Sequence, residues 1–147
     1  MWIISLIVFI GGIFTTTIAG IDTSISETNQ VILEGSWKPT MEQTKKALKA
    51  VQEFLINPDS ITKRDKREIK NILANISKYR VQFIGGVSDS GRKIIKCNFF
   101  PNSRDKDDFP YWKKDKVEVI DGGFWFWQIE YRIDNGKCRK FSSNGYA

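Results

Sequence analysis

The hydrophobic pattern of this 147-residue chain changes its period once, at Tyr79. Before this residue, apolar side chains recur every three or four positions, which is typical of helices with one buried face. After it, β-branched and aromatic residues alternate with polar ones, and turn residues separate the runs, which is typical of strands. Two helical stretches followed by consecutive strands indicate an α+β fold.

Local signals delimit both helical stretches. The first opens with the capping pair Thr40 and Gln43 and ends before Pro58, since the residue ahead of a proline avoids helical geometry. The second opens with Thr62 at its N-cap. We therefore predict two helices, over 40–56 and 62–77.

The second half of the chain contains the predicted strands, over 79–87, 92–100, 115–121, 123–133 and 137–143. Asn135-Gly136 turns the last pair, because Asn-Gly readily adopts the positive φ angles of a tight hairpin. The predicted architecture is α+β, with two N-terminal helices packed on a curved antiparallel sheet of four to five strands.

The first twenty residues carry no charge and are mostly apolar. An apolar core followed by small residues, here Thr17-Ile18-Ala19, is typical of a secretory signal peptide, although no basic residue precedes it. About 20 helical residues also suffice to span a bilayer core. We expect a cleaved signal peptide over 1–20, with an uncleaved membrane anchor as the alternative.

The remaining chain is predicted to contain a polar spacer over 21–36 and a single domain over 37–147. The spacer is rich in Ser, Thr, Asn and Gln, and its one short apolar patch is a candidate for a short strand or a docked segment. Together with the signal-like segment, this organisation indicates an exported protein, either periplasmic or secreted.

The chain contains no histidine. This absence removes the central residue of Ser-His-Asp and Cys-His nucleophile systems and of His-based metal sites, which excludes most hydrolase and metalloenzyme classes. Three aspartates in one loop, Asp105, Asp107 and Asp108, lack the glycine and the distal glutamate of a calcium loop. We therefore predict no catalytic residue, no metal and no cofactor.

Basic residues outnumber acidic ones by 23 to 17, which gives a net charge of +6. This excess attracts anionic partners without specifying one. Because the N-terminal segment predicts export, we expect a protein or an anionic envelope component as the partner, and no nucleic acid.

The run from Phe124 to Ile133 is predicted to place one apolar face in the core and leaves Phe124 and Phe126 on the other face. Either the 21–38 segment or a helix covers these two rings, or they form an exposed aromatic patch for a partner. In the preceding loop, an aromatic and basic cluster is either a solvated loop or a surface for an anionic polymer, sugar or lipid. The candidate partner-binding residues are Phe124, Phe126, Tyr111, Trp112, Lys113 and Lys114.

The chain has two cysteines, Cys97 and Cys138. An oxidising compartment favours a disulfide between them. In a simple meander of the predicted strands, however, they lie three strand spacings apart, about 14 Å, whereas bridged Cα atoms lie within about 7 Å. Both a disulfide and two free thiols remain open at this point.

The order of helices, glycine-containing hairpin and aromatic hairpin resembles cystatin-like and NTF2-like α+β rolls. Asp121-Gly122-Gly123, the aromatic strand to Tyr131 and the segment Asn144-Gly145-Tyr146-Ala147 resemble small exported bacterial proteins of unknown function. The Gln-x-Val-x-Gly inhibitor loop of cystatins is absent from the sequence. The resemblance therefore implies a fold and export, and no catalytic role.

These observations predict a small exported non-catalytic binding protein, such as an inhibitor, an immunity-type protein or an envelope-interaction module. One alternative is a small-ligand-binding or enzymatic NTF2-like domain, with a pocket in the sheet and carboxylates such as Asp121 or Glu130. The other alternative is a membrane-anchored structural subunit that retains residues 1–20.

Overall fold

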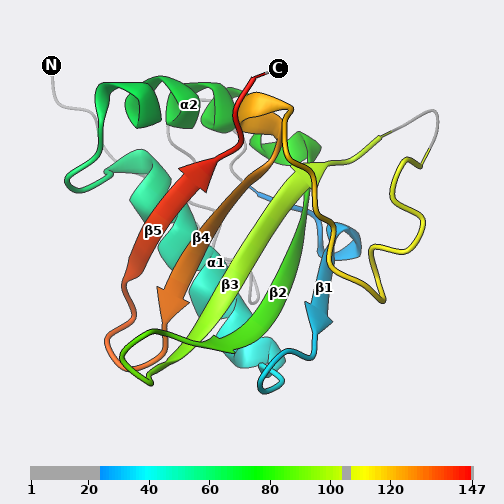
Figure 1. Ribbon diagram of the computed structural model, residues 1–147, viewed down its shortest axis with the longest axis vertical. Coiled ribbons are helices and arrows are strands. Elements are labelled where there is room, and N and C mark those ends of the chain that lie inside the picture. Colours follow the sequence, from blue (N-terminus) through cyan, green and yellow to red (C-terminus); the bar gives the residue numbers. More distant parts are fainter. Residues whose placement is uncertain (1–23, 104–106, 147) are drawn as a thin grey trace, which may run out of the picture.

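The computed structural model describes residues 24–103 and 107–146, and the segment predicted as a signal peptide lies outside them. Within this part of the chain, the fold is α+β, with two α-helices and a five-stranded mixed sheet in the order β1-β2-β3-β4-β5 (Figure 1). The helices are α1 (Met41–Ile56) and α2 (Lys63–Ala74). The strands are β1 (Gln30–Leu33), β2 (Tyr79–Val87), β3 (Lys93–Pro101), β4 (Trp127–Arg132) and β5 (Cys138–Ser143). The sheet does not close into a barrel, because its edge strands β1 and β5 do not pair.

The capping signals place both helices as predicted. The Thr40 hydroxyl accepts a hydrogen bond from the Gln43 amide at 3.2 Å, and the Gln43 side chain accepts one from the Thr40 amide at 2.9 Å. The second helix is shorter than predicted, because Asn75 leaves helical geometry. A 3-10 turn, η2 (Ile76–Lys78), then leads into β2.

The strands β2 to β5 form the predicted antiparallel meander. The prediction of a purely antiparallel sheet was wrong, because β1 pairs in parallel with β2. This strand comes from the segment expected to be a polar spacer, in which Ile25 and Leu33 are buried. The folded structure therefore begins before Trp37.

The predicted strand over 115–121 does not form. Residues 107–122, here called the strap, run as irregular chain in front of β2 and β3 (Figure 1). The apolar residues Val117 and Val119 alternate with exposed ones because their side chains pack under the strap, and this segment does not pair with a neighbouring strand. The next predicted strand also starts late, at Trp127. Gly122 and Gly123 have φ angles of 93° and 58° and turn the chain into a short 3-10 helix, η3 (Gly123–Trp125).

The sheet has an apolar cluster on each face. The larger one fills the space between the sheet and the helices, and Phe99 and Trp127 stack inside it with ring centroids 3.8 Å apart. The smaller cluster lies under the strap on the opposite face, where Phe100, Trp112 and Val117 are buried together. The strap is therefore a second covering layer for part of the sheet.

The C-terminal segment returns across η3. The Gly123 amide donates to the Gly145 carbonyl at 3.0 Å, and the Tyr146 ring occupies the space that a side chain at Gly123 would need. Among the described residues, no helix has the length and apolar character to cross a membrane.

Candidate functional site

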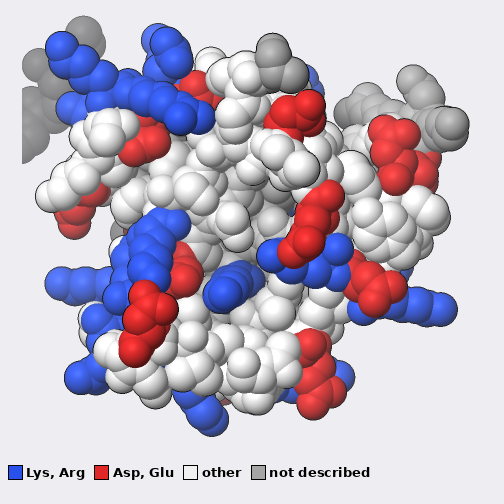
Figure 2. All heavy atoms as spheres, viewed as in Figure 1, with Lys and Arg blue, Asp and Glu red and all other residues white. Residues whose placement is uncertain are grey.

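The sheet face opposite α1, here called the open face, carries the candidate site. Alternate residues of β3 and β4 reach this face, and the register places Lys96 opposite Glu130 and Asn98 opposite Gln128. Figure 2 views the molecule from this side and shows charged side chains around a largely uncharged centre that contains isolated basic groups. The open face is therefore polar where the strap does not cover it.

A buried amide network fastens the strap beside this surface. Gln82 is fully buried, and its Nε2 donates to the carbonyl oxygens of Trp112 at 2.6 Å and Asp115 at 2.8 Å. Its Oε1 accepts from the Val117 amide at 2.9 Å and from Asn98 Nδ2 at 3.0 Å. Because both donors and both acceptor positions are used, the network holds the strap in one place.

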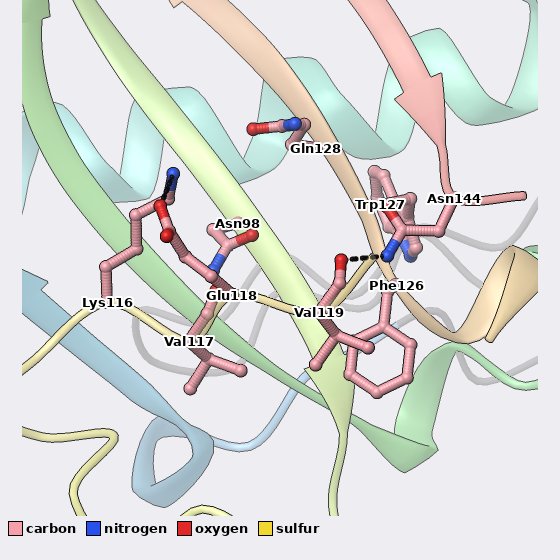
Figure 3. Close-up of a pocket in the computed structure, with 9 residues that line it drawn as sticks. All are labelled: Asn98, Lys116, Val117, Glu118, Val119, Phe126, Trp127, Gln128 and Asn144. Atoms are coloured by element: carbon pink, nitrogen blue, oxygen red, sulfur yellow. Dashed lines mark hydrogen bonds and ion pairs between the residues drawn. The ribbon is translucent and has the colours of Figure 1, made fainter. Parts of the chain in front are cut away.

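The first pocket lies between the strap and β4 and has a volume of about 180 Å³ (Figure 3). Lys116 and Glu118 form an ion pair of 2.9 Å on the strap side. On the other side, Asn144 donates to the carbonyl oxygens of Val119 and Asp121. Its lining residues are Asn98, Lys116, Val117, Glu118, Val119, Phe126, Trp127, Gln128 and Asn144.

A second pocket of about 270 Å³ adjoins the first, because Gln128 lines both. Its lining residues are Lys96, Gln128, Ile129, Glu130, Lys140 and Ser142. The two pockets together are here called the groove. No hydrogen bond or ion pair joins the side chains of Lys96, Gln128 or Ser142 to any residue that the structure describes.

A bulge between β4 and β5 explains why Lys96 has no acidic partner. The pairing shifts between Gln128 and Glu130, where Lys140 adopts a φ of 53°. The shift brings two consecutive basic residues to one carboxylate, with Arg139 Nε at 3.2 Å and Lys140 Nζ at 3.9 Å from Glu130. Glu130 is therefore engaged on β5, although Lys96 stands opposite it on β3.

The charges around the second pocket do not cancel. Three cations, Lys96, Arg139 and Lys140, face two carboxylates, Glu130 and Asp89, the latter 3.2 Å from Lys140 Nζ. One positive charge is in excess, and it belongs to the exposed ammonium of Lys96. The groove therefore offers a cation that is unpaired among the described residues, beside neutral hydrogen-bonding groups.

The structure does not gather the six predicted partner-binding residues into one patch. Trp112 is buried, with the Arg80 guanidinium 4.9 Å and the Lys113 ammonium 5.6 Å from its ring. Tyr111 is 41% exposed, and Lys113 and Lys114 are exposed as well.

The two phenylalanines among these residues pack on opposite faces of the sheet. Phe124 joins the helix-side cluster, and Phe126 joins the strap-side cluster, 5.9 Å from the Phe109 ring. The strap covers Phe126, in a cluster that Val31 of the 21–38 segment also joins, whereas Phe124 packs with residues of the helices. Sequence inspection missed the groove, whose signal is the polar residues at facing positions of the second and fourth predicted strands.

The two carboxylates considered for an enzymatic site lie in different surroundings. Asp121 is exposed on the strap, and Glu130 is held by its basic neighbours on β5. Within residues 24–103 and 107–146, no three His, Cys, Asp or Glu side chains come together as metal ligands.

Both cysteines are free thiols in the structure. They lie two strand spacings apart, with β4 between them, because the predicted strand over 115–121 does not intervene. Burial raises the pKa of the Cys97 thiol well above its ordinary value and that of Cys138 to about 12. The two sulfur atoms are therefore protonated at neutral pH and poorly nucleophilic.

Comparison of the chain with protein-family models, with curated proteins and with solved structures finds no match. The function is therefore inferred from the residues of the groove.

Proposed function

We propose that the chain is a small exported binding protein without a catalytic role, and that the groove of the open face recognises an acidic segment of a partner protein. The observation that carries this proposal is the ammonium of Lys96, which has no partner in the described structure, while Glu130 opposite it is already engaged by Arg139 and Lys140. A partner carboxylate can occupy the place that Glu130 leaves vacant.

The neighbours of Lys96 fit a carboxylate ligand. The Gln128 amide and the Ser142 hydroxyl line the same pocket and are free to donate hydrogen bonds. An ion pair at about 4 Å contributes about 1 kcal/mol in water and about 4 kcal/mol at an effective dielectric of 20. Because Lys96 is exposed, the lower figure applies. Binding of a partner segment therefore needs several contacts along the groove.

The overall shape supports a binding role. We propose that the meander and α1 form a roll of the cystatin-like or NTF2-like kind. In this roll α1 lies on one face of the sheet (Figure 1), and the groove lies on the other. The lack of histidine and the engagement of Glu130 favour binding over catalysis.

Export is the second part of this proposal, and it rests on the apolar segment 1–20. Mass spectrometry of the protein from its own cells tests it. A mature N-terminus near Ile21 is expected, whereas an intact Met1 in a membrane fraction would favour the anchored alternative.

Titration with a glutamate-rich peptide, followed by backbone NMR, tests the binding role. We expect saturable shifts at Lys96, Gln128 and Ser142, and an affinity about five- to tenfold lower for Lys96→Gln, which corresponds to about 1–1.4 kcal/mol. Lys45→Gln is the matched control, because it removes an exposed charge from α1, on the other side of the sheet. Equal weakening by both variants would reduce the effect to general charge attraction and overturn the proposal.

A further inference from the structure

A third pocket lies outside the groove, at the end of the sheet where β2 begins and β3 ends. Its volume is about 730 Å³, which is larger than either pocket of the groove and within the range of small-molecule sites. Its lining residues are Ser77, Lys78, Pro101, Asn102, Ser103, Asp108, Phe109, Gly122, Trp125 and Phe126. We refer to it as the aromatic pocket.

Three aromatic rings form the apolar part of its wall. Trp125 is half-buried, and its ring is held by Tyr79 and Phe124, with centroids at 5.6 Å and 4.9 Å. Phe126 and Phe109 meet edge to face at 5.9 Å. The rings are therefore positioned by packing before any ligand arrives, which lowers the entropic cost of binding.

Gly122 leaves room for the Phe126 ring in this wall. Its φ angle of 93° starts η3, and a side chain there would collide with the Phe126 ring. The backbone turn thus presents Trp125 and Phe126 on consecutive residues to the same pocket.

Neutral polar side chains form another part of the wall. The hydroxyls of Ser77 and Ser103 and the side-chain amide of Asn102 form no hydrogen bond with any residue in the described ranges. The backbone at Asn102 is held in place, because its N–H group donates to the Lys78 carbonyl at 2.7 Å. The pocket therefore holds donors and acceptors that have no partner among the described residues, beside its aromatic rings.

The charges of the described lining residues balance each other. Lys78 and Asp108 contribute one charge of each sign, and the Lys78 ammonium already binds Asn75 Oδ1 at 3.1 Å. This balance disfavours a phosphate or another anion and sets the aromatic pocket apart from the groove, where one positive charge is in excess.

We infer that the aromatic pocket binds a neutral sugar. A pyranose ring has an apolar C–H face that packs on aromatic side chains, and its edge carries hydroxyls that pair with amides, hydroxyls and carboxylates. Trp125 and Phe126 would contact the C–H face, and Asn102, with the two serines, would pair with the hydroxyls. This site is separate from the groove, so it does not depend on the acidic partner proposed above.

Saturation-transfer NMR with three neutral trisaccharides, maltotriose, cellotriose and the trimer of N-acetylglucosamine, tests this inference on the purified full chain. We expect at least one of them to show saturable transfer to its C–H protons. Trp125→Ala should abolish the transfer, and Asn102→Ala should weaken binding at least threefold. Lys96→Gln, in the groove, should leave it unchanged.

Asn102→Ala keeps the test decisive if Trp125→Ala fails to fold, because the Asn102 side chain makes no bond within the described structure. The absence of saturable transfer with all three sugars would overturn the inference. Full binding by a folded Trp125→Ala variant would overturn it as well. Adenosine binding more tightly than every sugar would reassign the pocket to a nucleobase.

Discussion

The hydroxyl of Tyr146 donates a hydrogen bond to the carboxylate of Glu68, 2.8 Å away, and so joins the C-terminal segment to α2. Glu68 is fully buried, and its other oxygen, Oε1, has no hydrogen-bond partner in the described structure, although Arg67 Nε lies 3.5 Å from it. Tyr146 therefore provides the hydrogen bond on which this buried carboxylate depends.

Tyr146→Phe should lower the free energy of unfolding by about 1–3 kcal/mol, because it leaves a buried acceptor without its donor. For a domain of this size, each kcal/mol of lost stability corresponds to a decrease of about 3–4 °C in Tm. Thermal unfolding followed by circular dichroism measures it. Tyr111→Phe is the matched control, since that hydroxyl has no partner among the described residues, and an equal loss there would contradict the explanation.

Gln82→Met should release the strap, because a side chain of similar size replaces an amide that makes four hydrogen bonds. At about 1 kcal/mol for each bond, we expect a loss of about 3–4 kcal/mol in the free energy of unfolding. Hydrogen exchange of the Val117 amide should also become faster, because that amide donates to Gln82 Oε1.

The control for Gln82→Met is Gln128→Met, which makes the same chemical change on the same sheet face. Gln128 is exposed and has no partner in the described structure, so unfolding and the exchange of the Val117 amide should stay as in the unmodified protein. Unchanged exchange at Val117 in Gln82→Met would show that other contacts hold the strap.

Local signals in the sequence were sufficient for the helices and the meander. Thr40 and Thr62 cap their helices through residues three positions away, and the alternation after Tyr79 is a property of each strand by itself. The strap escaped prediction because distant side chains hold its backbone, among them Gln82, which lies 35 residues before Val117. Alternating burial alone does not distinguish such a segment from a strand.

The groove was not predicted either, because it also depends on contacts between distant parts of the chain. The position of Lys96 opposite Glu130 depends on the register of β3 and β4, and the engagement of Glu130 by Arg139 depends on a bulge. Neither follows from composition or spacing. One short strand was considered for the segment that contains β1, but its parallel pairing with β2 was not predicted, because that pairing is non-local.

Gly85→Ala should destabilise the protein by about 1–3 kcal/mol, in the range of overpacked sites. The added Cβ would collide with the carbonyl oxygen of Trp37, which bridges to Gly85 across the sheet. Because the obstacle is backbone, it cannot rotate away, and the segment from β1 to Trp37 must move.

Gly86→Ala provides the comparison for Gly85→Ala. A Cβ at this neighbouring position would lie 3.5 Å from the nearest atom, on the flexible side chain of Lys96, which is ordinary contact. Chemical denaturation of both variants should therefore show a large loss for Gly85→Ala and a small change for Gly86→Ala. Similar midpoints for the two would refute the role assigned to the close approach of Trp37.

Asp134 should make stability depend on pH. Its carboxylate accepts hydrogen bonds from Arg132 at 2.7 Å and Arg92 at 2.6 Å, beside the last hairpin turn. The hydrogen bond from Arg132, and to a lesser extent that from Arg92, lowers the pKa of the carboxyl below its ordinary value of 3.8. A carboxyl with a lower pKa in the folded state stabilises the fold above its unfolded pKa, and this contribution disappears as the pH falls through the folded pKa.

Asp134→Asn should therefore be less stable than the unmodified protein at pH 7, and the difference should shrink steadily below pH of about 4 as the native carboxylate is protonated. Urea denaturation at a series of pH values measures this difference. Asp121→Asn removes the same charge at an exposed carboxylate that has no ion pair in the described structure, so it should have little effect on stability. A difference for Asp134→Asn that stays constant down to the lowest pH would mean that the carboxylate acts through its shape and packing, because a charge-assisted bond to the two arginines must weaken on protonation.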